Sequence, residues 1–226
     1  MNINVINLGK VDYAVALTIQ ETLQAARQSG EIEDTLLLLE HPPTLTLGTR
    51  GQYSNILVPT ELLEKNNIKI YEVNRGGDVT YHGDGQIVGY PIVNLTNFDR
   101  DIKSFIWNIE EIFIRLLKNE FGITAEREDK KFTGVWIADK KIAAIGMSVK
   151  HWVTMHGFAF NVNTNLDHFK LINPCGLIGK GVTSLEELTG EKQDFEKLNI
   201  LVTNYFCEVF NLDSKIINLK DLGLKV

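Results

Sequence analysis

The chain has 226 residues, of which 44% are hydrophobic and 23% charged, proportions that are typical of a folded globular protein and exclude an intrinsically disordered one. Lysine and arginine number 23 and aspartate and glutamate 29, so the net charge of −6 argues against a general nucleic-acid-binding protein, and no apolar run approaches the roughly 20 residues that span a bilayer. The N-terminal segment has the features of neither a secretory signal nor a transit peptide, so we expect a cytoplasmic protein without a nucleic-acid or membrane partner.

Helix and strand patterns alternate in the first half of the chain. Apolar residues at helical spacing predict a helix over Asp12–Gln28, which Ser29-Gly30 ends. The run TLLLLE at Thr35–Glu40 predicts a buried strand that stops at His41-Pro42-Pro43, because proline cannot continue the hydrogen-bonded ladder. Residues 85–95 contain glycine and proline among strand formers and predict a bent or edge strand. The other elements predicted here are strands over 44–47 and 69–73 and a short helix over 60–67.

The second half begins with the clearest helix, Asp101–Glu120, whose apolar residues form one face. Consecutive antiparallel strands are predicted after it, followed by a helix over Asp194–Phe210 and a strand after Ser214. Those consecutive strands are residues 135–137, 142–149 and 153–161. We therefore expect an α/β (α+β) fold, with a mixed, largely antiparallel sheet flanked by helices. No linker or repeat divides the chain, so residues 1–226 are predicted to be one domain.

The cysteines and histidines do not indicate a metal site. The two cysteines, Cys175 and Cys207, are too few for a disulfide framework and form no CxxC pair. The five histidines lack the spacing of metal ligands. We expect no metal ion.

A glycine-rich segment, Arg75–Gln86, is the first candidate for a binding site. Its four glycines allow the backbone to approach a ligand closely, and its side chains supply several polar and aromatic groups. It lacks the GxxxxGK[ST] spacing of a P-loop. The alternative is a water-exposed hairpin.

Two predicted strands carry polar residues in apolar surroundings. Lys141 opens the strand segment Lys141–Gly146, where it is either a solvated charge or, in a drier pocket, a base with a lowered pKa. The segment His156–Asn161 is either a core strand with a satisfied histidine or a strand whose Gly157 lets a ligand approach.

The segment Asn173–Leu177 displays Cys175 on a tight turn between proline and glycine. A thiol on a turn is a candidate nucleophile, whereas Cys207 lies among apolar residues as a structural cysteine does. The thiolate is the reactive form, so a base or cation is needed nearby. The sequence alone does not bring Lys141 to Cys175.

Taken together, these segments resemble the lipoyl(octanoyl) transferase family, the octanoyl-carrier-protein:protein transferases of lipoate synthesis. The matches occur in order between Glu40 and Leu185. They are Arg75–Gln86 with RGGxxTYHGPGQ, 141–146 with KIAAIG, 156–161 with an HGFALN-type strand, 174–176 with PCG, and 40–43 with EHPP. Asp84 departs from the pattern, because the family usually has proline there, and it adds a carboxylate near the predicted pocket.

The resemblance implies the fold of the biotin and lipoate protein ligases and a Cys/Lys dyad, with Cys175 as the acyl-thioester nucleophile and Lys141 as the lysine that lowers the thiol's pKa. It also implies a substrate pocket for the octanoyl chain. The residues implied to line it are Arg75, Gly76, Gly77, Asp78, Val79, Thr80, Tyr81, His82, Ala144, Ile145, Gly146, Gly157, Phe158 and Ala159.

The activity implied is transfer of octanoyl from octanoyl-acyl carrier protein to a lysine of lipoyl domains, those of 2-oxoacid dehydrogenases and of the glycine cleavage H protein. We expect a monomer that needs no cofactor, with a basic rim for the carrier protein at Lys130-Lys131, Lys140 and Lys150. Alternatives are an ATP-dependent lipoate or biotin protein ligase, a non-catalytic binding module, and a cysteine hydrolase using His82 or His156 as base.

Overall fold

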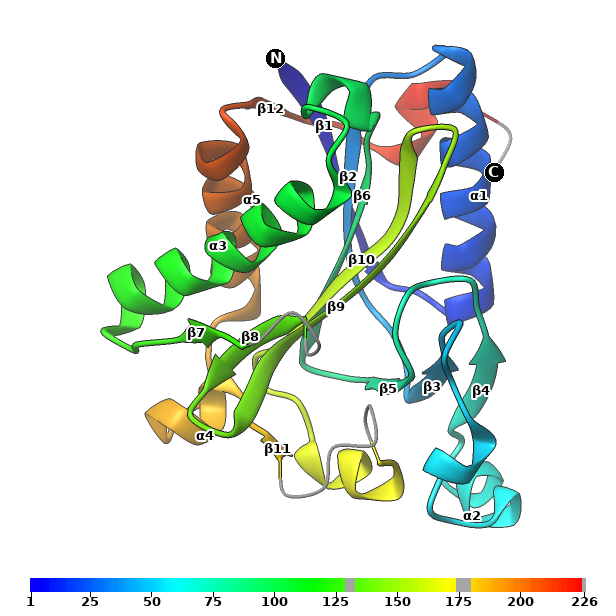
Figure 1. The fold of residues 1–226 in the computed structure, drawn as a ribbon, viewed down its shortest axis with the longest axis vertical. Coiled ribbons are helices and arrows are strands. Elements are labelled where there is room, and N and C mark those ends of the chain that lie inside the picture. Colours follow the sequence, from blue (N-terminus) through cyan, green and yellow to red (C-terminus); the bar gives the residue numbers. More distant parts are fainter. Residues whose placement is uncertain (129–132, 174–179, 225–226) are drawn as a thin grey trace.

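A long, mixed sheet forms the centre of the molecule (Figure 1). The structure is a computed structural model, and it describes residues 1–128, 133–173 and 180–224. Within these residues the sheet has nine strands in the order β12-β1-β2-β6-β10-β9-β8-β7, with β11 paired to β9. The strands are β1 (Asn2–Lys10), β2 (Thr35–Glu40), β6 (Gln86–Ile92), β7 (Glu126–Arg127), β8 (Gly134–Ile137), β9 (Lys140–Lys150), β10 (Val153–Asn161), β11 (Gly181–Val182) and β12 (Asp213–Ile216).

Helices cover both faces of this sheet (Figure 1). The helices α3 (Ile102–Phe121) and α5 (Phe195–Phe210) pack together on one face, where Phe105, Phe113 and Phe206 are buried. The helix α1 (Tyr13–Ser29) covers the other face and buries Leu23 against the strands. Each helix presents one apolar side to the sheet, so two separate apolar layers hold the three-layer arrangement together.

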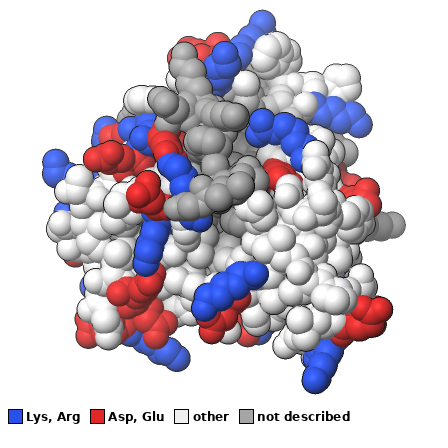
Figure 2. Space-filling model, turned by 60° about the horizontal axis from the view of Figure 1, so that its bottom comes forward, with Lys and Arg blue, Asp and Glu red and all other residues white. Residues whose placement is uncertain are grey.

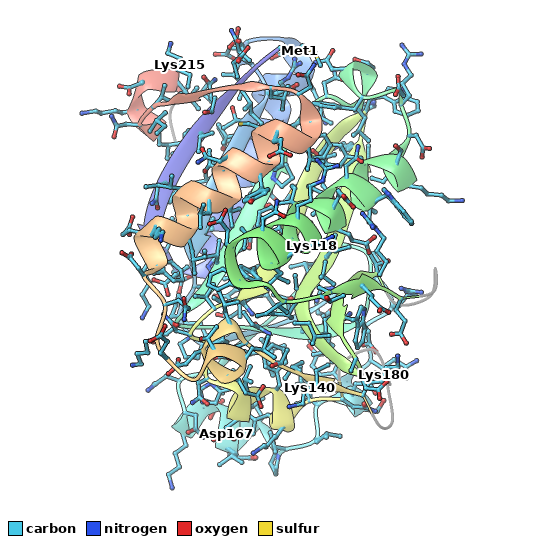
Figure 3. The ribbon with its side chains drawn as sticks, turned by 90° about the vertical axis from the view of Figure 1, so that its left-hand side faces the viewer. Met1, Lys118, Lys140, Asp167, Lys180 and Lys215 are labelled. Atoms are coloured by element: carbon cyan, nitrogen blue, oxygen red, sulfur yellow. The ribbon has the colours of Figure 1, made fainter. Side chains whose placement is uncertain are left out.

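A smaller sheet lies beside one end of the central sheet (Figure 1). Its strand order is β4 (Lys69–Glu72), β3 (Thr44–Leu47) and β5 (Val79–His82). The short helix α2 (Thr60–Lys65) and residues 166–171 pack close to it, and α4 (Leu185–Thr189) follows β11. The end of the molecule that carries Lys140 and Lys180 lies opposite the end that carries Met1 and Lys215 (Figure 3).

The predicted fold class and most predicted elements are confirmed, with boundaries shifted by a few residues at most. Asp12, Asp101 and Asp194 each accept a backbone hydrogen bond from the first turn of the helix that follows, which explains where α1, α3 and α5 begin. The strand β1 was not predicted. It pairs in parallel with β2 and with β12, so the sheet joins the N-terminal strand to the last strand of the chain.

Residues 85–95 were predicted to be a bent or edge strand, and the edge position is wrong, because β6 lies inside the sheet between β2 and β10. Pro91 is tolerated there because the regular β6–β10 pairs run only from Gln86 to Gly89. Beyond them the Pro91 ring lies against Gly157, where a Cβ would come 2.7 Å from Pro91 Cδ. Thr154 Oγ1 donates a hydrogen bond of 2.6 Å to the Pro91 carbonyl and ties the two strands at this point.

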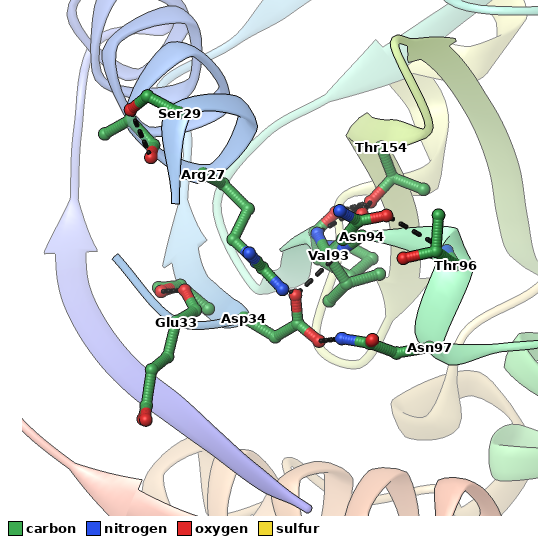
Figure 4. Close-up of polar contacts among 12 residues, drawn as sticks. Arg27, Ser29, Glu33, Asp34, Val93, Asn94, Thr96, Asn97 and Thr154 are labelled. Atoms are coloured by element: carbon green, nitrogen blue, oxygen red, sulfur yellow. Dashed lines mark hydrogen bonds and ion pairs between the residues drawn. The ribbon is translucent and has the colours of Figure 1, made fainter. Parts of the chain in front are cut away.

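A buried carboxylate ties α1 to the residues after β6 (Figure 4). Asp34 accepts hydrogen bonds from Arg27 Nε at 2.6 Å, the Asn94 backbone N–H at 2.8 Å and Asn97 Nδ2 at 3.1 Å. Its side chain is only 5% exposed and that of Arg27 16%. The ion pair is therefore poorly screened by water.

We expect Asp34→Ala to lower the free energy of unfolding by about 3 kcal/mol, because it leaves the Arg27 charge and the Asn94 N–H without this acceptor. Urea denaturation measures the change. Asn97→Ala is the matched control, since it removes one of the three bonds and no charge, and should cost about 1 kcal/mol. Equal losses in the two variants would contradict the prediction.

Candidate active site

A cavity of about 200 Å³ lies between the central sheet and the smaller sheet. Its walls come from the loop before β5, from β5 itself, from the facing strands β9 and β10, and from residues 180–182. Lys141 lines it, together with most of the residues that the resemblance implies for the pocket. Those implied residues are Arg75, Gly76, Gly77, Asp78, Val79, Thr80, His82, Ala144, Ile145, Gly146, Gly157, Phe158 and Ala159. The fold thus places segments that are far apart in the sequence around a single cavity.

Tyr81 is the implied pocket residue that does not line the cavity. Successive side chains of a strand point to opposite faces, so Tyr81 points away from the side of β5 that Thr80 and His82 present to the cavity. Its hydroxyl is 2.7 Å from His168 Nδ1, and its ring packs edge-on against Phe169. Tyr81 therefore contacts the small core beneath the smaller sheet.

Arg75 holds the glycine-rich loop in place from inside. Its guanidinium is buried and donates from Nη2 to the carbonyls of Thr46, at 2.7 Å, and Asp78, at 2.8 Å. These bonds connect the loop to β3. The Asp78 carboxylate accepts hydrogen bonds from the Asn55 side chain at 2.6 Å and from the Val79 N–H at 2.7 Å, so it also fixes the loop.

The loop lies directly on β9. Gly76 N donates a hydrogen bond of 2.9 Å to the Met147 carbonyl. A Cβ on Gly146 would lie 2.7 Å from the Gly76 carbonyl oxygen, a distance that requires the backbone to shift. Gly146 is thus required for this close approach, which forms one wall of the cavity.

Lys141 occupies one end of the cavity. Its Nζ donates a hydrogen bond of 3.1 Å to the Thr133 carbonyl and lies 4.7 Å from the centre of the Trp136 ring. Lys180 Nζ lies 4.8 Å from the same ring and forms an ion pair with Glu128. The side chain of Lys141 is partly buried, so it is not an ordinary solvated lysine.

Three buried histidines line or adjoin the cavity, and all three are neutral near pH 7. Burial lowers the pKa of His41 to about 4, of His82 to about 3 and of His156 to about 4, and the charge of Arg75 adds to the effect at His156. His41 Nδ1 donates to the Val11 carbonyl, so its Nε2 accepts from the Tyr90 hydroxyl, each at 2.7 Å.

His156 is unusual within its strand. It has a φ of 59° and donates its backbone N–H to Gln20 Oε1 at 2.9 Å. Its Nε2 donates to Asn74 Oδ1 at 2.7 Å, while its buried Nδ1 has no partner among the residues described. A left-handed backbone in the middle of a strand is typical of a functional site.

Some predictions fall outside the described residues: Cys175 with its PCG turn, and Lys130-Lys131. Among the described residues that flank Cys175 in the sequence, Asn173 N donates to the Asn55 carbonyl at 2.7 Å, and Lys180 lines the cavity.

The predicted basic rim is not brought together by its described members. Lys140 pairs with Glu187, and Lys150 lies at the other end of β9. Lys and Arg side chains are interspersed with Asp and Glu on the face that carries the smaller sheet (Figure 2). The Asp84 carboxylate pairs with Lys10 and does not line the cavity.

Several lining residues gave no sequence signal, because they belong to segments whose pattern indicates only packing. Tyr13 comes from α1, Ile106 from α3 and Tyr90 from β6, while Trp136 stands on β8.

Among the residues described, no group of three or more His, Cys, Asp and Glu side chains could hold a metal ion. None of the described helices is both long and apolar enough to cross a membrane.

Comparison with known proteins identifies the family. The family model described as the lipoyl protein ligase A/B catalytic domain matches residues 12–207. The octanoyltransferase of Caldicellulosiruptor bescii is 57% identical over 222 residues, which cover 98% of this chain and 97% of that protein. The octanoyltransferase of Desulforamulus reducens is 55% identical over 223 residues, which cover 99% and 97%.

Solved structures share the fold at much lower identity. Lipoate-protein ligase A bound with ATP matches with a TM-score of 0.78 at 17% identity, over 98% of this chain and 92% of that one. The biotin protein ligase of Aquifex aeolicus matches with a TM-score of 0.53 at 15% identity, over 92% and 69%. The resemblance found in the sequence is therefore confirmed: the chain belongs to the lipoyl protein ligase A/B catalytic domain family and, within it, to the octanoyltransferases, which are acyltransferases.

Proposed function

We propose that this chain transfers an octanoyl group from octanoyl-acyl carrier protein to a lysine ε-amine of lipoyl domains, through a thioester on Cys175. The acceptors are the lipoyl domains of 2-oxoacid dehydrogenases and the glycine cleavage H protein. One observation carries the proposal: Lys180, five residues after Cys175 in the sequence, lies over the same Trp136 ring as Lys141. A residue close to Cys175 in the sequence thus lies beside Lys141 in the lining of the cavity.

In the first half of the reaction Lys141 takes the proton of the Cys175 thiol, and the thiolate attacks the thioester carbonyl of the donor. A carbon–sulfur bond forms to Cys175, and the bond to the phosphopantetheine sulfur breaks. The departing thiolate takes the proton back from Lys141. The enzyme then carries an octanoyl thioester.

In the second half the acceptor lysine attacks that thioester as a neutral amine. A carbon–nitrogen bond forms, the bond to the Cys175 sulfur breaks, and Lys141 carries the amine's proton to the sulfur. The thioester supplies the energy for amide formation. No ATP, metal ion or other cofactor enters this scheme.

The apolar wall of the cavity suits the octanoyl chain. Ile145, Phe158 and Ala159 line it alongside the close backbone contact at Gly146. Burying the chain contributes about 0.8 kcal/mol for each methylene group, or roughly 5 kcal/mol in total. That is enough to favour octanoyl over much shorter acyl groups.

Mass spectrometry of the protein after incubation with octanoyl-acyl carrier protein, without ATP, tests the proposal. We expect a hydroxylamine-labile octanoyl adduct on Cys175 that passes to an added lipoyl domain. Cys175→Ser should form no adduct. Cys207→Ser is the matched control and should react normally, because Cys207 is half-buried on α5 and burial raises its pKa.

Two outcomes would contradict the proposal. Transfer that requires free octanoate and ATP would identify a ligase. Free octanoate as the main product, formed by a Lys141→Ala enzyme as fast as by the unchanged one, would identify a histidine-dependent hydrolase.

A further inference from the structure

Glu110 is a buried carboxylate that the proposed reaction does not use. It stands on α3, whose other fully buried side chains are apolar, and it is 6% exposed. A buried carboxylate is costly unless it has partners that compensate for lost hydration. The groups that compensate for the lost hydration of Glu110 therefore indicate what this carboxylate does.

The two oxygens of Glu110 contact the two strands β7 and β8, which pair with each other. Oε1 accepts a hydrogen bond of 2.9 Å from the Gly134 backbone N–H, at the start of β8. Oε2 lies 3.3 Å from Arg127 Nε on β7. One carboxylate thus fixes the start of β8 relative to α3.

The Gly134 N–H belongs to the same peptide group as the Thr133 carbonyl. That carbonyl accepts the hydrogen bond from Lys141 Nζ at 3.1 Å. A peptide group is planar, so holding its N–H also sets the direction of its C=O. A continuous hydrogen-bonded path therefore runs from Glu110 through one peptide group to the amine of Lys141.

The stem of Lys141 lies against the same peptide group. Gly134 has a φ of 138°, and a Cβ there would lie 3.1 Å from Lys141 Cε and 2.6 Å from the Ala143 carbonyl oxygen. The lysine stem is thus packed against Gly134, while its amine is hydrogen-bonded to the Thr133 carbonyl of the same peptide group. A rotation of this peptide group would move both the stem and the hydrogen-bond acceptor.

We propose that Glu110 is a positioning residue for Lys141, acting through the peptide group of Thr133 and Gly134. The inference rests on the function proposed above for Lys141. Electrostatics agree with this placement: burial raises the pKa of Glu110, while the Gly134 N–H, Arg127 and Lys141 act in the opposite direction.

Two substitutions separate the hydrogen bond from the charge. Glu110→Gln keeps an oxygen that accepts from Gly134 N–H but loses the charge. Glu110→Asp keeps the charge but is one methylene group too short to reach. Glu110→Gln keeps the bulk of the side chain and Glu110→Asp loses only one methylene group, so both variants should fold. Glu111→Gln is the matched control, because Glu111 also pairs with Arg127 but does not contact Gly134.

The experiment measures kcat and KM for octanoyl-acyl carrier protein, and the single-turnover rate constant for acylation of Cys175. We expect Glu110→Asp to lower kcat and the acylation rate constant about 10- to 100-fold, with KM changed less than about twofold, because a displaced general base loses rate rather than binding. Glu110→Gln should stay within about threefold of the unchanged enzyme, and Glu111→Gln should match it.

The reverse order, with Asp active and Gln impaired, would overturn the inference, because charge rather than the peptide contact would then matter. Rates unchanged in both variants would also overturn it. Lys141→Ala in the same assay distinguishes a failure of the function proposed for Lys141 from a failure of the role proposed for Glu110. If that variant keeps full activity, the function proposed for Lys141 is wrong; if it is inactive while Glu110→Asp is normal, only the role of Glu110 is wrong.

Discussion

Lys141→Ala should slow octanoyl transfer to the enzyme by about 10²- to 10⁴-fold, the usual contribution of a positioned general base. The substitution removes the amine that the Thr133 carbonyl and the Trp136 ring hold at the end of the cavity. The donor still binds, because the walls formed by β5 and β10 remain. Single-turnover acylation with octanoyl-acyl carrier protein measures the rate constant independently of how much enzyme is active.

Lys140→Ala provides the matched control for this measurement. Lys140 is the preceding residue of β9, but it is exposed and pairs with Glu187. Its loss should leave the acylation rate within about twofold, since an exposed ion pair contributes little. Equal rates in Lys141→Ala and the unchanged enzyme would show that another group takes the thiol proton.

Acid should destabilise the protein steeply between pH 6.5 and about 4, through the three buried histidines. His41, His82 and His156 have pKa values lowered by burial to about 4, 3 and 4, against 6.5 for an unburied histidine. Each would cost about 1.4 kcal/mol for every pH unit in this window. The three together would cost about 4 kcal/mol for each pH unit.

The direction follows from proton binding. In this window the unfolded chain binds protons at these histidines and the folded chain does not, so lowering the pH favours unfolding. Their full contribution to stability is present above pH 6.5 and is lost progressively as the pH falls to their folded pKa values. Glu110 acts in the opposite sense, because burial raises its pKa. A single carboxyl group offsets at most the proton uptake of one of the three histidines.

Denaturant unfolding at a series of pH values tests this, because the slope of the unfolding free energy against pH counts the protons taken up. Replacing His41 or His156 by glutamine should lower that slope by about one proton. His151→Gln is the matched control, since His151 is exposed at the β9–β10 hairpin. A stability independent of pH from 7 to 5 would contradict the burial of these imidazoles.

Elements with a strong local pattern could be predicted from the sequence. The helix α3 combines an N-terminal aspartate, a long apolar face and a following glycine, so its limits were predicted to within one residue. The strand β6 could be predicted as a strand but not placed, because the position of a strand in a sheet depends on partners that are distant in sequence. Pro91 favours an edge by itself, yet the interruption of the β6–β10 ladder lets it lie inside the sheet.

In the candidate site, too, the residues in local motifs could be predicted, and those placed by distant partners could not. Short motifs identified the glycine-rich loop and the segment after Lys141, since glycines and isolated polar residues in apolar runs are visible locally. The orientation of Tyr81 depends on the alternation of β5 against the smaller sheet. Glu110 gave no signal, because a carboxylate on a helix is normally a solvated group.

The sequence by itself determined the family of this protein, its fold class and three of the segments that line the cavity, 75–86, 141–146 and 156–161, because these depend on short-range patterns of apolar, glycine and polar residues. Only the tertiary structure decided that the Lys141 amine is held by a peptide group which Glu110 fixes, and that the three histidines are neutral. The physical reason is that burial and hydrogen-bond geometry arise between residues far apart in the chain, where no local pattern records them.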